Sequence, residues 1–263
     1  CLPDGVRQAH QLCRVNYAYE NIHFPEAPEA LDIARRRLAF EELFFFAIGL
    51  KLLRSRRETV SVEPFQPVDM APFYNALPFT LTDAQRRCVD EAIADMESGR
   101  PMNRLCQGDV GSGKTMVAAA CVYFCVKNGR QAALMAPTEL LAEQHYRGLA
   151  PLLERLNIRC ALLTGSTTAK TKRSVTAQLA TGEIDFAIGT HALISGSVAY
   201  ADLGLVVTDE QHRFGVAQRT ALAEKGEHPH TLVMSATPIP RTLALILYGD
   251  LDVSVIDQLP PGR

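Results

Sequence analysis

The chain has 263 residues, of which 47% are hydrophobic and 21% are charged, and its formal net charge is −2. This length suffices for one large α/β domain with an appendage or for two small domains, and the composition excludes wholesale disorder. A net charge close to zero gives no general argument for a polyanionic partner. Any nucleic-acid surface must therefore be local.

The seven cysteines include no C-x-x-C pair, and no histidine stands near Cys121 and Cys125 to complete a metal set. This usage favours free thiols in a reducing compartment. The most apolar run, residues 39–53, is interrupted by Glu41, Glu42 and Lys51, so we expect no membrane span. No signal peptide is recognisable, and a chain that begins with Cys is expected to be part of a larger protein.

The first part of the chain is predicted to be helical. Residues 29–57 follow Pro28, which suits a first helical turn, and their apolar residues recur at helical spacing. The basic run 35–37 is interpreted as a solvated helix face, and the helix as a strut rather than a DNA-facing surface. The proline-rich residues 60–79 are interpreted as a linker into a new unit. We therefore expect a helical segment with its linker at 1–64 and a second domain at 65–263.

From residue 80 onward, short apolar runs alternate with longer helical patterns. The expected strands are 104–107, 131–136, 159–163, 184–189, 203–208 and 231–235. Near-continuously apolar strands separated by amphipathic helices predict an α/β fold, in which helices cover both faces of a parallel sheet. In such a sheet, sites form beyond the carboxyl ends of the strands.

Residues 108–115, GDVGSGKT, match the phosphate-binding pattern G-x-x-x-x-G-K-[ST] at every position, between an expected strand and an expected helix. In this three-layer P-loop NTPase arrangement, backbone N–H groups surround phosphate oxygens at a helix N-terminus. Lys114 is predicted to reach the β- and γ-phosphates of ATP, and the Thr115 hydroxyl to hold Mg²⁺. The candidate cofactor-binding residues of the loop are Gly108, Asp109, Val110, Gly111, Ser112, Gly113, Lys114 and Thr115.

Two adjacent carboxylates follow the expected strand 203–208 in the run LVVTDEQH. An isolated Asp-Glu pair would most simply face water at the end of a strand. Because a P-loop enzyme needs a carboxylate on a second strand for its metal, we predict that Asp209 holds Mg²⁺ and that Glu210 activates the attacking water. The sequence thus predicts that residues 108–115 and 209–210 converge on one magnesium–ATP complex.

Several runs together resemble the first RecA-like motor lobe of superfamily-two helicases. They are PFTLTDAQ (78–85), LCQGDVGSGKT (105–115), MAPTELLAEQH (135–145), TGS (164–166), GTHAL (189–193), VVTDEQHRFGV (206–216) and MSATPIPRTLA (234–244). Residues 23–44 also resemble the segment that precedes the motor in the branched-DNA helicases of this superfamily. The resemblance implies an ATP-dependent DNA helicase of recombination and repair in the bacterial cytoplasm. Its implied partners are forked or branched DNA, a second RecA-like lobe and an upstream DNA-binding module.

The same resemblance assigns roles to single residues. Gln85 would read the adenine edge, and Phe79 or a neighbour would help to seat the base. Thr82 and Gln85 also form a T-x-x-Q capping box, which needs only a helix end. Contacts to the DNA backbone are implied for Pro137, Thr138, Glu139, Gly165, Ser166, Thr190 and His191. For Gly165, Ser166, Thr190 and His191, ordinary loop roles stand as the alternative. Coupling between nucleotide and DNA is implied for Gln211, His212, Ser235, Ala236, Thr237 and Arg241. His212 would also approach the γ-phosphate, unless it is a hydrogen-bonded core histidine.

Other classes of P-loop protein remain as alternatives. The transcription-repair coupling ATPases share similar glycine-rich and ATPIPRTL runs, but DEQH and APTELLAEQH favour the branched-DNA helicases. A kinase would need an arginine-rich lid and a GTPase an N-K-x-D guanine reader, and neither is recognisable; a scaffold that keeps a relic motor is a third possibility. Because the implied second lobe supplies the arginine finger, we expect these 263 residues alone to bind Mg-ATP weakly and to hydrolyse it negligibly.

Overall fold

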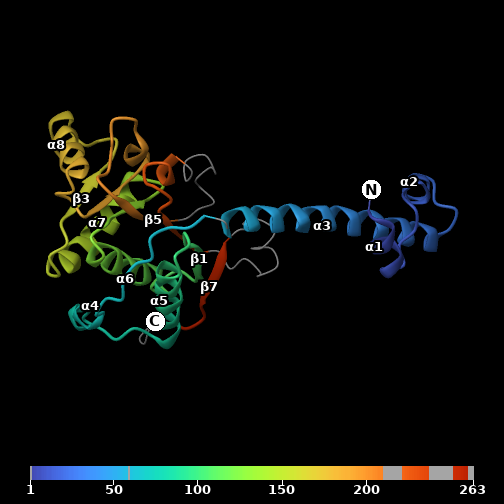
Figure 1. Cartoon of the computed structure of the whole chain (residues 1–263), viewed down its shortest axis with the longest axis horizontal. Coiled ribbons are helices and arrows are strands. Elements are labelled where there is room, and N and C mark those ends of the chain that lie inside the picture. Colours follow the sequence, from blue (N-terminus) through green and yellow to red (C-terminus); the bar gives the residue numbers. More distant parts are fainter. Residues whose placement is uncertain (1, 59, 210–220, 237–250, 260–263) are drawn as a thin grey trace. The chain divides into compact units, whose positions relative to one another are not determined.

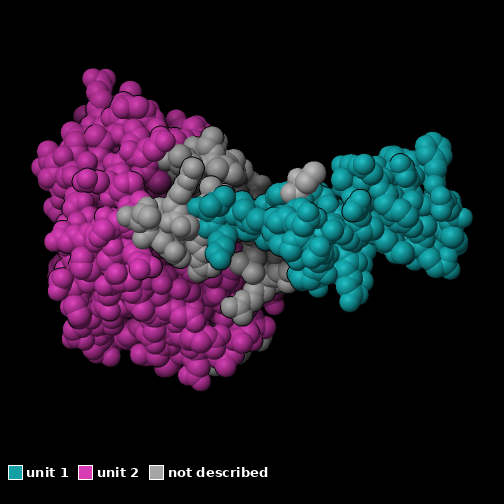
Figure 2. All heavy atoms as spheres, turned by 45° about the vertical axis from the view of Figure 1, so that its right-hand side comes forward, with its two compact units in different colours: residues 1–57 teal, residues 58–263 magenta. Residues whose placement is uncertain are grey.

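The computed structural model describes residues 2–58, 60–209, 221–236 and 251–259. The chain divides into two compact units, residues 1–57 and residues 58–263, which are coloured separately in Figure 2. Each unit is described by itself. Among the described residues, none of the helices combines the length and the apolar character that crossing a membrane requires.

The first unit is helical, as predicted. It comprises α1 (Asp4–Ala9), α2 (Val15–His23) and α3 (Pro28–Glu58), whose last residue lies in the second unit. The prediction that residues 35–37 face solvent is wrong for Arg37, which is only 2% exposed. Arg35 and Arg36 are exposed, as predicted. The Arg37 guanidinium pairs with Glu41 and donates through Nε to the carbonyl of Cys13 at 3.0 Å. This arginine therefore ties α3 to the segment between α1 and α2.

The proline-rich segment before the sheet is packed against its own unit. The N–H of Val62 donates to the carbonyl of Gly99 at 3.0 Å, and the N–H of Phe65 donates to Met96 at 3.1 Å. Phe65 is buried with the core that contains Phe124. The segment then enters the short helix α4 (Ala71–Ala76) and the longer helix α5 (Asp83–Glu97).

The second unit contains a seven-stranded sheet in which every pairing is parallel (Figure 1). The strand order is β3-β4-β2-β5-β6-β1-β7. The strands are β1 (Asn103–Gly108), β2 (Gln131–Met135), β3 (Cys160–Leu163), β4 (Phe186–Gly189), β5 (Leu203–Asp209), β6 (His230–Ser235) and β7 (Asp252–Ile256). All six expected strands are thus confirmed, and β7 is an additional strand at the edge beside β1.

Helices cover both faces of this sheet, and the expected three-layer fold is confirmed. The helices that follow the strands are α6 (Lys114–Lys127), α7 (Glu139–Glu154) and α8 (Ala169–Ala180), with a short 3₁₀ helix η1 (His191–Ile194) after β4. Successive side chains of a strand point to opposite faces. In β2, Leu134 packs in the core cluster that includes α6, whereas Ala133 packs in the cluster that includes Val175 of α8. The sheet is therefore buried from both sides.

Candidate functional site

The glycine-rich loop and Asp209 lie at the same edge of the sheet. Strands β5, β6 and β1 are consecutive neighbours and run parallel, so their carboxyl ends open onto one edge. The loop follows β1, Asp209 ends β5, and only β6 separates the two, which corresponds to about 10 Å. In the register of the sheet, Asp209 is level with Met234 and Gln107 is level with Ser235. Ser235, one of the expected coupling residues, therefore ends the strand that lies between the two candidate sites.

The backbone of the loop has the shape that a phosphate group requires. Gly111 and Gly113 adopt φ values of 85° and 88°, in the left-handed region that side chains disfavour. A Cβ atom on Gly108 would lie 2.6 Å from the Ser112 hydroxyl oxygen. That hydroxyl is buried and has no hydrogen-bond partner among the described residues, which leaves a polar atom inside the loop for a ligand. The residues present therefore fit a phosphate-bearing nucleotide.

Lys114 and Thr115 open α6 immediately after this loop. Lys114 donates through Nζ to the carbonyls of Gly108 at 2.6 Å and Asp109 at 2.9 Å, so its ammonium group lies over the turn. Thr115 lies in the first turn of α6, where the N–H groups of the helix end and the helix dipole favour an anion. At the tip of the loop, Val110 is 84% exposed. The predicted phosphate-binding residues are thus brought together in one turn.

Gln85 joins the start of α5 to the glycine-rich loop. Its Oε1 accepts from the N–H of Thr82 at 2.9 Å, and the Thr82 hydroxyl accepts from the N–H of Gln85, so the expected capping box is present. Its Nε2 also donates to the carbonyl of Ser112 at 2.7 Å. The residue is only 2% exposed. The Gln85 side chain therefore links the start of α5 to the glycine-rich loop, and its contact with the adenine edge stays a prediction.

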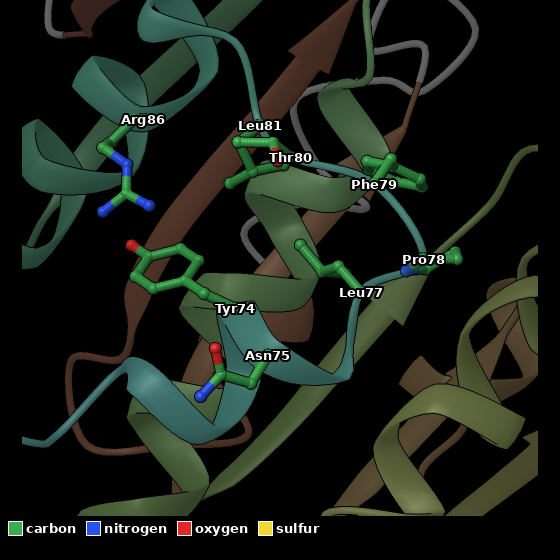
Figure 3. A pocket seen from close by; sticks show the side chains of 8 residues that line it. All are labelled: Tyr74, Asn75, Leu77, Pro78, Phe79, Thr80, Leu81 and Arg86. Atoms are coloured by element: carbon green, nitrogen blue, oxygen red, sulfur yellow. The ribbon is translucent and has the colours of Figure 1, made fainter.

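Phe79 lines a pocket of about 460 Å³ that lies beside the N-terminus of α5 (Figure 3). Its ring is 49% exposed and available for stacking. The guanidinium of Arg86 lies over the ring of Tyr74, 4.2 Å from its centroid, on the opposite wall. Sequence reasoning missed Tyr74 and Arg86. Arg86 directly follows Gln85, and this adjacency was the signal that could have indicated it.

Asp209 has a partner that sequence reasoning also missed. His145 of α7 approaches its carboxylate, with 2.7 Å between Nε2 and Oδ2. The side chains of His145 and Asp209 are 11% and 15% exposed. His145 follows the N-cap Thr138 by seven residues, or about two helical turns, so it lies on the same face of α7 as Thr138. This spacing was the signal in the sequence that could have indicated His145.

The expected DNA-backbone residues gather at the ends of β2, β4 and β3, which are neighbours at the same edge of the sheet. Thr138 caps α7 by accepting from the N–H of Leu141 at 3.3 Å, directly after Pro137. Glu139 accepts from the N–H of Ser166 at 3.0 Å, and the hydrogen bonds of Ser166 lower the pKa of this carboxyl. The strand ends that carry 137–139 and 165–166 are therefore in direct contact.

Thr190 and His191 complete this group at the end of β4. His191 is exposed, whereas Thr190 is buried and its hydroxyl lacks a partner among the residues described. Gly165 and Ser166 are exposed beside them. Five other predicted site residues lie outside the described residues: Glu210, Gln211, His212, Thr237 and Arg241. Ala236, which follows Ser235, is half-buried.

The family model that describes DEAD/DEAH box helicases matches residues 82–246. This stretch contains the glycine-rich loop, the end of β5 and the start of the segment after β6. The chain belongs to the DEAD/DEAH box helicase family.

Similarity to individual proteins extends over the whole chain. It is 50% identical to the ATP-dependent DNA helicase RecG of Synechocystis and 48% identical to that of Bacillus subtilis; the alignments cover 100% of this chain and 32% and 39% of those proteins. The chain thus spans about a third of the length of these relatives. A structure of RecG bound to a three-way DNA junction matches with a TM-score of 0.87 and 46% identity, over 100% of this chain and 36% of that one. The resemblance inferred from the sequence runs is confirmed.

Proposed function

We propose that this chain is the ATP-binding motor lobe of an ATP-dependent DNA helicase that acts on branched DNA in recombination and repair. The observation that carries the proposal is the shared edge of the sheet, where the glycine-rich loop and Asp209 are separated by one strand. The similarity to RecG over the full chain supports the choice of substrate. Transcription-repair coupling ATPases and non-motor P-loop proteins gain no comparable support.

ATP and Mg²⁺ would bind across this shared edge. The loop 108–115 would hold the phosphates, and the Thr115 hydroxyl and the Asp209 carboxylate would hold Mg²⁺, which neutralises developing phosphate charge when bound. The base would enter the pocket that Phe79 lines. Glu210 would orient and deprotonate the attacking water. These assignments divide the work among phosphate binding, metal binding and water activation.

DNA would bind along the neighbouring strand ends. Thr138, Ser166 and His191 are exposed there and would offer two hydroxyl groups and an imidazole to phosphate oxygens. Glu139 would hold this surface in shape, because its carboxylate bonds Ser166. The other partners in this proposal are a second RecA-like lobe and an upstream DNA-binding module. The proposed location is the cytoplasm.

This function is tested by ATP hydrolysis in a longer protein that contains this chain and has the full length of its relatives, called the longer protein below. We expect three-way junction DNA to stimulate turnover at least tenfold, and Glu210→Gln to keep ATP binding while turnover stalls, because an amide cannot take a proton from water. Lys114→Ala is the control that removes nucleotide binding itself. ATP turnover that DNA does not stimulate would indicate a switch or a kinase instead. Normal turnover by Glu210→Gln would show that Glu210 does not activate the attacking water.

A further inference from the structure

His145 and Asp209 form a polar contact between two elements that the sequence separates by 64 residues. The contact follows from the topology of the sheet. Strand β2 leads into α7 and pairs directly with β5, and Met135 near the end of β2 is level with Thr208. The first two turns of α7 therefore rise beside the end of β5, and one helical face presents His145 to Asp209.

The direction of the hydrogen bond follows from the chemistry of its partners. An ionised carboxylate has only acceptor atoms, so the imidazole donates through its Nε2–H to Oδ2. This donation fixes one carboxylate oxygen and the orientation of the group. The other oxygen, Oδ1, has no hydrogen-bond partner among the residues that the structure describes and remains for a further ligand. Metal-binding carboxylates are commonly held in this way by a hydrogen bond from a neighbouring residue, and loss of such a partner weakens metal binding about 10- to 100-fold.

We propose that His145 is a positioning residue for Mg²⁺ binding, and that it acts by holding the Asp209 carboxylate in the orientation that the metal requires. This inference rests on the proposed function, because it takes Asp209 as a magnesium ligand. His145 does not itself contact metal or nucleotide. It affects only the part of nucleotide binding that depends on Mg²⁺.

The contact is not needed to hold α7 in place. The helix is capped by the Thr138 hydroxyl at its N-terminus. Its packing comes from fully buried side chains further along, among them Leu149 and Leu153. His145 and Asp209 are both partly exposed, which places their hydrogen bond at the rim of the site rather than in the core. A role in positioning explains this hydrogen bond better than a role in helix packing.

The test compares His145→Gln with His145→Asn in the 263-residue chain. The glutamine amide extends as far as Nε2 and retains a donor for Asp209, whereas the asparagine amide is one methylene shorter. The matched control is Arg147→Ala, which removes an exposed side chain from the same helix. Affinity for a fluorescent N-methylanthraniloyl-ATP is measured with MgCl₂ and again with EDTA.

We expect Mg²⁺ to tighten binding in the unmodified chain, in Arg147→Ala and in His145→Gln. In His145→Asn the gain from Mg²⁺ falls at least tenfold, while the affinity in EDTA is unchanged. Bound Mn²⁺ used in place of Mg²⁺ gives a second readout. Its electron paramagnetic resonance spectrum in His145→Asn should differ from that of the unmodified chain and shift towards that of Asp209→Asn.

Two results would overturn different parts of this account. If His145→Asn keeps the full Mg²⁺ effect and the unaltered Mn²⁺ spectrum while Asp209→Asn loses both, His145 has no positioning role. If Mg²⁺ leaves nucleotide affinity unchanged in the unmodified chain, the proposed metal site itself fails. An equal loss in EDTA and in MgCl₂ for His145→Asn would likewise contradict the inference, because it indicates general damage to the nucleotide site.

Discussion

His230 shows how a single buried residue makes the stability of this fold depend on pH. It lies at the start of β6, is 2% exposed and packs edge-on against Phe65. Its Nδ1 accepts from the N–H of Met102 at 2.9 Å, so the neutral ring is the form that the site accommodates. Burial, reinforced by the nearby Arg130, lowers the pKa of His230 from 6.5 to about 4.

We expect His230 to stabilise the fold above pH 6.5 and to lose this contribution as the pH falls towards 4. The unfolded chain binds the extra proton in that interval, so stability rises with pH there, by about 3 kcal/mol in total. His230→Asn keeps an acceptor for Met102 but does not titrate. Urea unfolding between pH 4 and 7 should show a shallower pH slope for this variant. Identical slopes would contradict the assignment.

At the scale of single residues, the shape of the glycine-rich loop was predictable from the sequence because it depends on local properties, whereas phosphate binding by the loop stays a prediction. The glycines supply positive φ, and Lys114 and Thr115 open a helix. The contact of His145 with Asp209 was not predictable from such reasons. It depends on strand order, which brings α7 beside β5, and strand order is a property of the whole sheet.

At the scale of elements, the contact between α5 and the glycine-rich loop couples a helix cap to the site. A Cβ atom on Gly113 would lie 2.2 Å from Gln85 Nε2, so the helix end and the loop are packed tightly together. Gln85 serves the capping box with one end of its amide and the loop carbonyl of Ser112 with the other. Two substitutions can separate these two functions.

Thr82→Ala removes the helix cap but leaves the hydrogen bond from Gln85 to Ser112. Gln85→Glu keeps a T-x-x-E capping box, but it places a carboxylate oxygen against the carbonyl oxygen of Ser112. We expect Thr82→Ala to cost about 1 kcal/mol of stability with little change in nucleotide affinity. Gln85→Glu should weaken nucleotide binding severalfold. The measurements are thermal unfolding and nucleotide titration. If Gln85→Glu binds nucleotide normally, the residue is only a helix cap.

Most elements were predictable because their patterns are local. The expected strands are short runs rich in apolar residues, and β2, β4 and β5 are buried on both faces, which is the pattern of a parallel sheet. The edge strand β7 was missed, since its DVSVI run alternates polar and apolar residues and one face of it remains exposed at Val255. The proline-rich segment was interpreted as a linker, and only tertiary contacts show Phe65 buried in the core.

At the scale of the whole molecule, the proposed function makes the chain one side of a nucleotide site. The site residues that the structure describes all come from the carboxyl edge of one sheet and the pocket beside α5. In the proposed function ATP would bind between this lobe and a second lobe, whose arginine finger would contribute about 10³- to 10⁵-fold to turnover. We therefore expect the chain to retain ATP binding without retaining ATP hydrolysis.

We expect the 263-residue chain alone to bind ATP and to hydrolyse it at least a thousandfold more slowly than the longer protein does with branched DNA. Steady-state phosphate release, with nucleotide binding measured on the same sample, checks this expectation. DNA-stimulated turnover by the isolated chain at the rate of the longer protein would mean that one lobe is sufficient.

The central claim is that the loop and Asp209 bind one and the same magnesium nucleotide. A double-mutant cycle with Thr115→Ala, Asp209→Asn and their combination tests this claim through the gain in ATP affinity on adding Mg²⁺. If both residues hold one metal, either substitution removes most of the gain and the combination removes little more. Fully additive losses, or an Asp209→Asn variant with an unaltered gain, would show that the two segments serve different ligands.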